Sequence, residues 1–165
     1  MKFSPAPVRC TVPSPLGNLT LAAYDHALVG LWFELQQHLP DYTKWRVDRD
    51  HPVLRTTAEQ LQQYFDGQRR TFDVPLNLSN GTAFQQRVWR SLLAIAPGST
   101  STYGAISLNI GQPSAVRAVG GAIGRNPIGI IVPCHRVVGS NGALTGYAGG
   151  LERKVALLRL ESELL

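Results

Sequence analysis

Hydrophobic and polar residues in the first half of the chain alternate as they do in β-strands. Residues 19–23 follow this alternation, and a second apolar run at 28–33 comes after the polar pair Asp25-His26. Two such runs across a short polar turn predict a β-hairpin. Residues 36–52 are polar and contain two prolines, so they predict a loop.

Apolar side chains between residues 57 and 65 recur at helical spacing, and Gly67 supplies a stop signal. Residues 71–78 return to the alternation of a strand. We therefore expect residues 1–80 to form a small α+β domain. They contain no group of residues with catalytic chemistry, which favours a scaffold role. Asn80-Gly81-Thr82 breaks the pattern and marks the domain boundary.

Residues 81–165 predict a second, mostly helical domain. Thr82 is a suitable N-cap for a helix that ends before Pro97-Gly98. Its apolar face consists of Phe84, Val88, Leu92 and Leu93. A last helix is predicted over residues 151–160.

Two short helices are predicted between these, over residues 102–110 and 114–123. Gly111 lies in the turn, and either Ser114 as a cap or Pro113 in the first turn begins the second helix. This arrangement matches a helix-turn-helix, although many unrelated helix pairs share it.

The second of these helices is built from small residues. It accepts Gly120 and Gly121 side by side, although glycine costs roughly 1 kcal/mol relative to alanine inside a helix. Two explanations remain open: a close approach of DNA, or tight packing against another helix. Arg117 is the only charge on the helix before Arg125, and it is placed to enter a groove or a base stack.

Charge is distributed unevenly between the two halves. Residues 1–83 carry eight Lys/Arg and eight Asp/Glu, whereas residues 84–165 carry eight against three, so the second half holds the whole net charge of +5. No acidic residue lies between Asp73 and Glu152. That stretch does contain arginines, namely Arg87, Arg90, Arg117, Arg125 and Arg136. This charge pattern is typical of a surface that binds phosphates, and a solvated basic face is the alternative interpretation.

The two cysteines, Cys10 and Cys134, do not make a disulfide framework. Residues 1–5 lack the apolar region of a secretory signal. The longest apolar stretches, at 27–33 and 128–132, fall short of the ~20 residues that a membrane-spanning helix needs. We therefore expect a cytoplasmic protein without a membrane partner, in a compartment that keeps a thiol reduced.

The most informative stretch is an apolar run at 128–132 that leads into Pro133-Cys134-His135-Arg136. A buried strand is predicted for the run. Both His135 and Arg136 favour the thiolate form of a neighbouring cysteine, which is the nucleophile. Neighbours in a strand point to opposite faces, so either Pro133 marks a turn or a water bridges Cys134 and His135. A buried, inert cysteine is the alternative.

A histidine that acts as a base needs an orienting partner. The carboxylates of the second half are Glu152, Glu161 and Glu163. Glu161 directly follows an apolar run and is the one expected to turn inward. Asn126, before Pro127, is placed to tie the helix pair to the cysteine segment through backbone hydrogen bonds, although the pair also suits an ordinary turn.

Residues 145–150 form a glycine-rich loop with one aromatic residue, Tyr147. Such a loop is able to close over a flat ring by stacking. A plain connector and a phosphate cradle are the alternatives, but the lysine spacing of a P-loop is missing.

Pro133-Cys134-His135-Arg136-Val137 resembles the active-site motif of the O6-alkylguanine-DNA alkyltransferases. Other matches fall in family order and spacing: Pro15-Leu16-Gly17, Phe84, Val88-Trp89, Pro97-Gly98, Tyr103-Gly104, Arg117–Gly120, Asn126-Pro127 and Gly146–Gly150. The resemblance covers nearly the whole chain and is strongest from Phe84 to Glu161.

The resemblance implies a ribonuclease-H-like N-terminal domain and a C-terminal domain whose helix-turn-helix binds the minor groove of double-stranded DNA. It implies that alkylated guanine rotates out of the duplex and that the alkyl group passes irreversibly to Cys134, one turnover per molecule. It implies a monomer and no metal or organic cofactor. Repair of O4-alkylthymine and cooperative binding to DNA are left open.

Roles for single residues also follow from the resemblance. Cys134 attacks the alkyl carbon, His135 takes the thiol proton through water, and Glu161 orients His135. Asn126 belongs to the same catalytic group, and Tyr103 helps to protonate the leaving guanine. Arg117 takes the place of the flipped base. The remaining DNA contacts are Tyr103, Gly104, Gln112, Ser114 and Ser140, and the base pocket is formed by Val137, Tyr147 and Ala148.

Two features depart from some family members. Ala148 stands where some carry serine, which leaves only a backbone N–H to contact the base. Some members bind zinc in the first domain, but here Cys10 is its only cysteine and no ligand cluster stands out. His26, His38 and His51 are expected at the surface or in loops.

Three other classes of protein remain as alternatives. A damage sensor would hold the base without a cysteine, which Cys134 opposes. A helix-turn-helix regulator leaves the Pro-Cys-His-Arg motif unexplained. A cysteine hydrolase would need an oxyanion hole and has no use for the basic second half.

Overall fold

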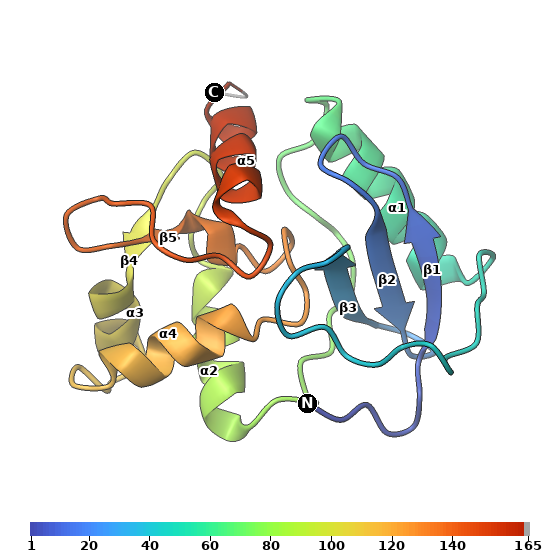
Figure 1. Ribbon diagram of the computed structural model, residues 1–165, viewed down its shortest axis with the longest axis horizontal. Helices are drawn as coiled ribbons and strands as arrows, with labels where there is room; N and C mark the ends of the chain where they lie inside the picture. The colour runs from blue at the N-terminus through green and yellow to red at the C-terminus, as the bar shows by residue number, and fades with distance from the viewer. Residues whose placement is uncertain (164–165) are drawn as a thin grey trace.

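Three antiparallel strands in the order β1-β2-β3 form the sheet of the N-terminal half. They are β1 (Val8–Val12), β2 (Leu19–Ala23) and β3 (Leu28–Phe33). The computed structural model describes residues 1–163. Helix α1 (Pro52–Phe65) packs across one face of the sheet, at the right of Figure 1. Its buried stripe includes Leu54, Leu61 and Tyr64.

The other face of the sheet is covered by aromatic side chains instead of a helix. Trp32 from β3 lies against Phe3 and Trp45, with ring centroids 5.7 and 6.0 Å apart. Tyr42 completes this cluster. β2 and β3 are therefore buried on both faces, which explains why they are almost continuously apolar in sequence.

The C-terminal half is mostly helical, as expected from its spacing. Its elements are α2 (Ala83–Leu92), β4 (Ser101–Thr102), α3 (Tyr103–Asn109), α4 (Val116–Gly124), the 3-10 turn η1 (Cys134–Arg136), β5 (Val137–Val138) and α5 (Leu151–Glu163). Thr82 caps α2 in a reciprocal capping box with Gln85. A small sheet domain followed by a helical domain is thus confirmed.

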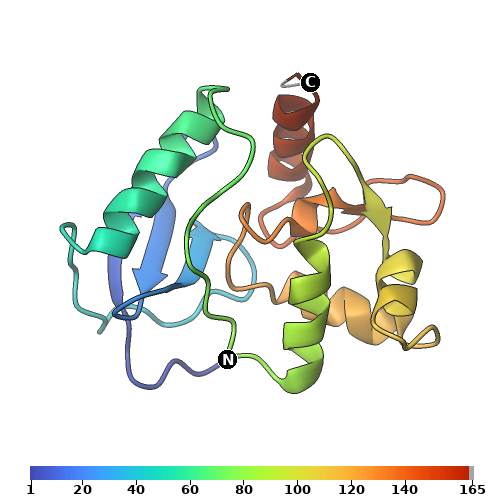
Figure 2. The same cartoon turned by 180° about the vertical axis from the view of Figure 1, so that it is seen from behind.

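The edge of β3 joins the two halves through its backbone. The N–H of Leu31 donates to the carbonyl of Pro127 (2.8 Å), and the N–H of Gly129 donates back to Leu31 (3.0 Å). The segment that leads to Cys134 is therefore seated against the N-terminal sheet. Figure 2 shows the connection from α1 to α2 running between the two halves.

The strand predicted over residues 71–78 is wrong. The segment is extended, but it pairs with β3 only at Leu76, through a single parallel bridge to Leu28. Pro75 lacks an N–H to donate, so a continuous ladder is not available there. Of its alternating apolar side chains, Val74 and Leu78 are buried and Phe72 and Leu76 are partly buried against the same hydrophobic core.

The strand predicted over residues 128–132 is also wrong. These residues form turns, with Ile130 in the left-handed region at φ 67°. Their apolar side chains are buried because the segment lies between the sheet and the helical half. Burial on all sides, and not a strand, accounts for the apolar run.

Several helix boundaries differ from the pattern-based prediction. α2 ends at Leu92 and not just before Pro97, and α5 continues to Glu163, three residues beyond its predicted end. α1 begins at Pro52, five residues before the predicted start, with His51 as its N-cap.

α4 begins at Val116, and its N-cap is Ala115, which makes no side-chain cap hydrogen bond. Both predicted starts are therefore wrong: Ser114 does not cap this helix, and Pro113 lies before its first turn. Gly111 takes the predicted turn conformation, at φ 74°. Strand β1 has no counterpart in the prediction.

Within the described residues, none of the helices has the length and apolarity to cross a membrane.

Candidate active site

Cys134 begins the 3-10 turn η1, directly after the turn at Pro133. Cys134 and His135 therefore do not lie in a strand, and the requirement that strand neighbours point to opposite faces does not apply to them. Only 7% of Cys134 is exposed. Its sulfur accepts a hydrogen bond from the Nδ2 atom of Asn126 at 3.1 Å.

Asn126 holds the cysteine segment in shape. Its Nδ2 atom also donates to the carbonyl of Val132 (2.8 Å), and its Oδ1 atom accepts from the N–H of Ile128 (3.0 Å). The side chain is buried. One amide therefore connects the residue after α4 to the backbone before Cys134 and to the sulfur itself.

Glu161 lies on the buried face of α5 and accepts hydrogen bonds from three side chains. His135 Nε2 lies 2.7 Å from Oε1, and Tyr64 donates to the same oxygen at 2.8 Å. Arg136 donates to both oxygens, at 2.8 and 2.9 Å. Burial raises the pKa of Glu161, but the hydrogen bonds and charges of His135 and Arg136 outweigh it and hold that pKa at about 2.

The ionised Glu161 fixes the tautomer of His135. A carboxylate only accepts, so Nε2 must carry the proton. Burial lowers the pKa of His135 below its ordinary value of 6.5, although Glu161 opposes this. The imidazole is then neutral at pH 7, and its Nδ1 atom has no hydrogen-bond partner among the described residues. That nitrogen holds a free lone pair and is able to take up a proton.

Burial raises the pKa of the Cys134 thiol. The hydrogen bond from Asn126 and the charge of Lys154 lower it in part. The resting group is therefore a thiol, and a neutral base beside it is needed to form the thiolate.

The loop after β5 covers this region. Val137 is fully buried, and Tyr147 and Ala148 are partly buried. Burial raises the pKa of the Tyr147 hydroxyl, which therefore stays protonated and uncharged. The hydroxyl of Thr145 donates to Tyr103 Oη at 3.3 Å, which connects this loop to the start of α3. Ser140 lies exposed in the turn that follows β5.

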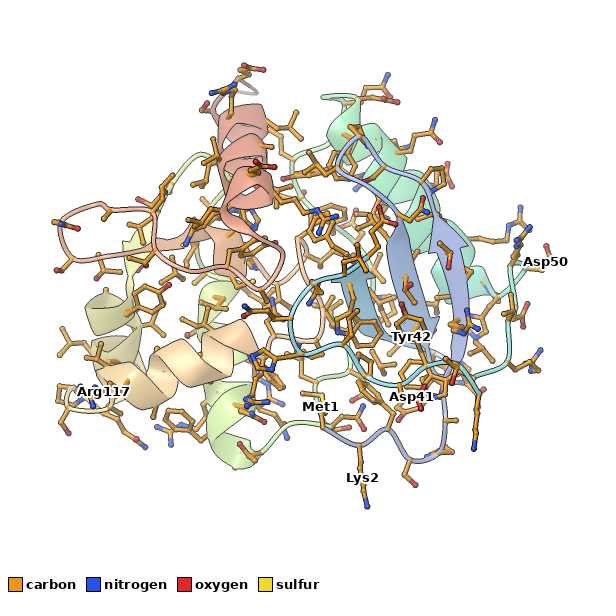
Figure 3. The ribbon with its side chains drawn as sticks, viewed as in Figure 1. Met1, Lys2, Asp41, Tyr42, Asp50 and Arg117 are labelled. Carbon is orange, nitrogen blue, oxygen red and sulfur yellow. The ribbon has the colours of Figure 1, made fainter. Side chains whose placement is uncertain are left out.

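The outer face of α4 is open and nearly free of side-chain bulk. Arg117, Ala118 and Gly121 are exposed on it. An added Cβ at Gly121 would meet nothing within 4 Å, and one at Gly120 would meet only Tyr103 at 3.9 Å. Tight packing against another helix therefore does not explain these glycines, and the face they form is open. Figure 3 shows Arg117 at the outer end of α4, away from the labelled residues of the sheet half.

The other predicted DNA contacts lie around the same helix pair. Gly104 is in the first turn of α3, and Gln112 and exposed Ser114 are in the turn before α4. The turn is fixed by the side chain of Ser107, which donates to the carbonyl of Gln112.

Two sequence profiles of one family match the chain. The profile of the DNA binding domain of 6-O-methylguanine DNA methyltransferase matches residues 83–163, and that of its ribonuclease-like domain matches residues 8–78. The chain belongs to this family.

Individual methyltransferases of this kind are similar over almost their whole length. A methylated-DNA–protein-cysteine methyltransferase of Mycobacterium bovis is 51% identical over 151 residues, which cover 92% of this chain and 90% of the relative. One of Haemophilus influenzae is 45% identical over 150 residues, covering 90% and 83%. The crystal structure of Mycobacterium tuberculosis OGT in complex with DNA has a TM-score of 0.87 and 49% identity, covering 95% of this chain and 94% of that one.

In this methyltransferase, Arg136 does not belong to a basic surface, contrary to its place in the charge pattern. It is buried, paired with Glu161 and bonded to the carbonyl of Ile95 at 2.5 Å. It therefore stabilises the carboxylate and does not act on the thiol directly. The other four arginines of the acid-free stretch are exposed.

Sequence reasoning missed two residues of the methyltransferase site. Lys154 is fully buried, and its Nζ atom donates to the carbonyls of Val137 (2.6 Å) and Thr145 (2.8 Å). Tyr64 reaches Glu161 from α1. A signal for Lys154 exists in the sequence, because it shares the buried stripe of α5 with Leu157 and Glu161 at helical spacing.

Across residues 1–163, no three His, Cys, Asp or Glu side chains are grouped as metal ligands would be. Cys10 is buried in the core of the sheet half.

Proposed function

We propose that this protein repairs O6-alkylguanine in duplex DNA by transferring the alkyl group to Cys134. The observation that carries the proposal is the arrangement of the thiol. Cys134 is buried, bonded to Asn126, and followed by a neutral histidine whose protonated nitrogen is held by Glu161. This is a nucleophile with a base and an orienting group, within a family whose relatives are methylated-DNA–protein-cysteine methyltransferases.

The transfer is a single displacement. The Cys134 thiol loses its proton to Nδ1 of His135 through a water molecule. The Sγ atom then forms a bond to the alkyl carbon while the bond from that carbon to O6 of guanine breaks. Tyr103 donates its hydroxyl proton to the leaving base. Atoms and charges balance without a further reactant.

The buried polar groups around the thiol favour this step. Asn126 and Lys154 stabilise negative charge on the sulfur. Glu161 stabilises the positive charge that His135 acquires. The product is a thioether, and release of the alkyl group would require a nucleophile to attack its carbon and displace the Cys134 thiolate, so each molecule acts once.

We propose that α3 and α4 form the helix-turn-helix and that α4 enters the minor groove. The open face of Ala118 and Gly121 brings the helix backbone close to DNA, and Arg117 fills the space left by the flipped guanine. Tyr103, Gly104, Gln112, Ser114 and Ser140 contribute the further contacts to the duplex.

The flipped base is proposed to lie between Val137 and the loop of Tyr147 and Ala148, whose backbone N–H replaces the serine contact of some relatives. We assign the boundary to residues 80–81 and a ribonuclease-H-like fold to the first domain. The protein acts as a monomer in a reducing cytoplasm.

The decisive test is the intact mass of the protein after incubation with duplex DNA that contains O6-methylguanine. We expect a gain of one methyl group per molecule, absent from a Cys134→Ser variant. Tight binding to the lesion without any gain in mass would instead identify a damage sensor. Absence of both would reject the proposal.

A further inference from the structure

The loop that carries Tyr147 and Ala148 is held by its carbonyl groups. We call residues 145–149 the pocket loop. Its five consecutive carbonyls each accept a hydrogen bond. The donors, in order, are Lys154 Nζ for the first two, Gly150 N, Gln37 N and Arg153 Nη1. Gly150 is simply the next residue of the chain, but the other donors are more distant groups, which therefore impose the shape of the loop.

The two anchors at its C-terminal end connect it to the sheet half. The N–H of Gln37, just after β3, donates to the carbonyl of Ala148 at 2.9 Å. The Arg153 side chain, from the first turn of α5, donates to Gly149 at 3.2 Å. This end of the pocket loop thus depends on the N-terminal half.

Arg153 bonds to three backbone segments at once. Besides Gly149, its Nε atom donates to the carbonyl of Leu16 in the β1–β2 turn (2.9 Å), and its Nη1 atom donates to the carbonyl of Glu34 (3.1 Å). Its guanidinium carbon lies 4.6 Å from the centroid of the Phe33 ring. A planar group with several donors is suited to such bridging, which a single ammonium group does not reproduce.

The position of Gly149 determines where the Tyr147 ring lies. A Cβ added to Gly149 would stand 2.6 Å from Cε2 of Tyr147 and 3.0 Å from Cδ2 of Phe33. The glycine backbone is therefore in close contact with both rings. Any shift of Gly149 away from Phe33 moves the ring that lines the proposed base pocket.

We propose that Arg153 is a positioning residue for alkyl transfer, through which the N-terminal half fixes the pocket loop and the ring of Tyr147. The proposal rests on the function proposed above. The first domain is then part of the machinery that places the base, and not only a scaffold. Within residues 1–163, Arg153 makes no hydrogen bond to Cys134 or to the His135–Glu161 pair.

A positioning role has a distinct kinetic signature. Loss of Arg153 should slow a reaction that needs the guanine placed against Tyr147, because small misplacements of a reactant cost up to about 100-fold in rate. It should leave the intrinsic reactivity of the thiol unchanged, because Asn126, His135, Glu161 and Lys154 are untouched. A general disruption of the fold would change both.

The experiment compares Arg153→Met with a matched control, Arg159→Met, which removes an exposed arginine from the same helix. Two rates are measured by intact mass: methyl transfer from duplex DNA containing O6-methylguanine, and alkylation of Cys134 by iodoacetamide, which needs no base pocket. We expect Arg153→Met to slow methyl transfer by about 10- to 100-fold and iodoacetamide alkylation by less than about twofold. The control should change neither rate.

Arg153→Lys keeps the positive charge and provides a second variant if Arg153→Met does not fold. We expect an intermediate rate of methyl transfer, because one ammonium group does not span all three carbonyls. Equal methyl transfer by wild type and both folded variants would overturn the inference, as would parallel losses in both rates. If wild type gains no methyl group at all, the proposed function fails and this inference with it.

Discussion

Helices α4 and α5 belong to the same half of the molecule but use their faces in opposite ways. α5 buries a lysine and a glutamate on one stripe and satisfies both with hydrogen bonds. α4 exposes Ala118 and Gly121, where almost nothing projects from the backbone. One helix thus concentrates polar groups away from solvent, and the other leaves a bare surface.

The difference assigns the two helices to different tasks: α5 supports the reaction at Cys134, and α4 supports recognition of DNA. A buried polar group stabilises the fold only when it is fully bonded, and the carboxylate of Glu161 fulfils this while holding the base. An exposed helix face without side chains contributes little to the fold, so its composition is free to suit a partner. Changes at Lys154 and Glu161 of α5 should therefore affect both stability and reaction rate, whereas changes on the exposed face of α4 should act mainly on DNA binding.

Replacement of Glu161 by Gln should give the largest effect. Methyl transfer should fall roughly 100-fold or more, because His135 loses the charge that stabilises its protonated form. The free energy of unfolding should fall by about 3 kcal/mol, because Arg136 is left buried without its partner. Single-turnover kinetics and urea denaturation measure the two quantities. Glu152→Gln, at an exposed position of α5, is the control. A normal rate in the Glu161→Gln variant would end the assignment of Glu161.

Replacement of Arg117 by Ala should act on duplex substrates alone. Base flipping costs a few kcal/mol of unstacking, so transfer from duplex DNA should slow by roughly 10- to 100-fold. Transfer from a single-stranded oligonucleotide with the same lesion should be nearly unchanged, as should the unfolding free energy. Arg55→Ala, at an exposed position of α1 in the sheet half, is the control. Equal losses on both substrates would contradict the flipping role.

Substitutions at Gly121 test whether the exposed face of α4 serves DNA binding and not the stability of the fold. Gly121→Ala should stabilise the helix by up to about 1 kcal/mol, since nothing lies near the added Cβ. Gly121→Leu should fold equally well but weaken duplex binding about tenfold or more, which corresponds to about 1.4 kcal/mol. Fluorescence anisotropy with labelled DNA measures the affinity. Tight binding by the Gly121→Leu variant would show that α4 does not approach DNA closely.

Of these effects, the change in the rate of methyl transfer with pH near neutrality should be the smallest. The pKa of His135 lies below 6.5 and that of Cys134 above its ordinary 9.0, so the rate should be level between pH 7 and 8. It should fall as acid protonates His135. A rate that rises steadily from pH 7 to 8 would instead indicate that hydroxide, and not His135, removes the thiol proton.

Stability should depend on pH through His135 and Glu161. Both pKa values are lower in the folded state, so each contribution is complete above the ordinary pKa and is lost on acidification. For Glu161 the loss extends from its ordinary pKa of 4.5 down to about 2. Denaturant unfolding between pH 7 and 3 should show a decline below the ordinary pKa of His135, 6.5, and a steeper one below 4.5. The Glu161→Gln variant should lack the second decline.

Much of the architecture could be predicted from local patterns. The strands at 19–23 and 28–33 and the helix cap at Thr82 follow from periodicity and short-range hydrogen bonding. Strand β1 was missed although Val8, Cys10 and Val12 alternate with Arg9 and Thr11 as in a strand, because the run is short and prolines flank it on both sides. Its partner β2 supplies the ladder that local sequence does not reveal.

Errors concentrate where the two halves meet. The runs at 71–78 and 128–132 are apolar because they fill the interface, and periodicity alone does not distinguish this from a strand. At the site, the sequence was enough to predict that Cys134 lies beside His135 as a candidate nucleophile and that Glu161 points inward. The bonds of Arg136, Lys154 and Arg153 were not, because each partner is a backbone or carboxylate distant in the sequence.

The backbone bonds between Leu31 and the Pro127–Gly129 segment have a consequence for inheritance. A strand edge and its partner must keep a fixed register, because a slip by one residue reverses every side chain. Exchange of the first half for that of a distant relative would have to preserve this spacing as well as the volume of the interface. A C-terminal half made without the first would lack the strand edge that holds the backbone of the segment leading to Cys134.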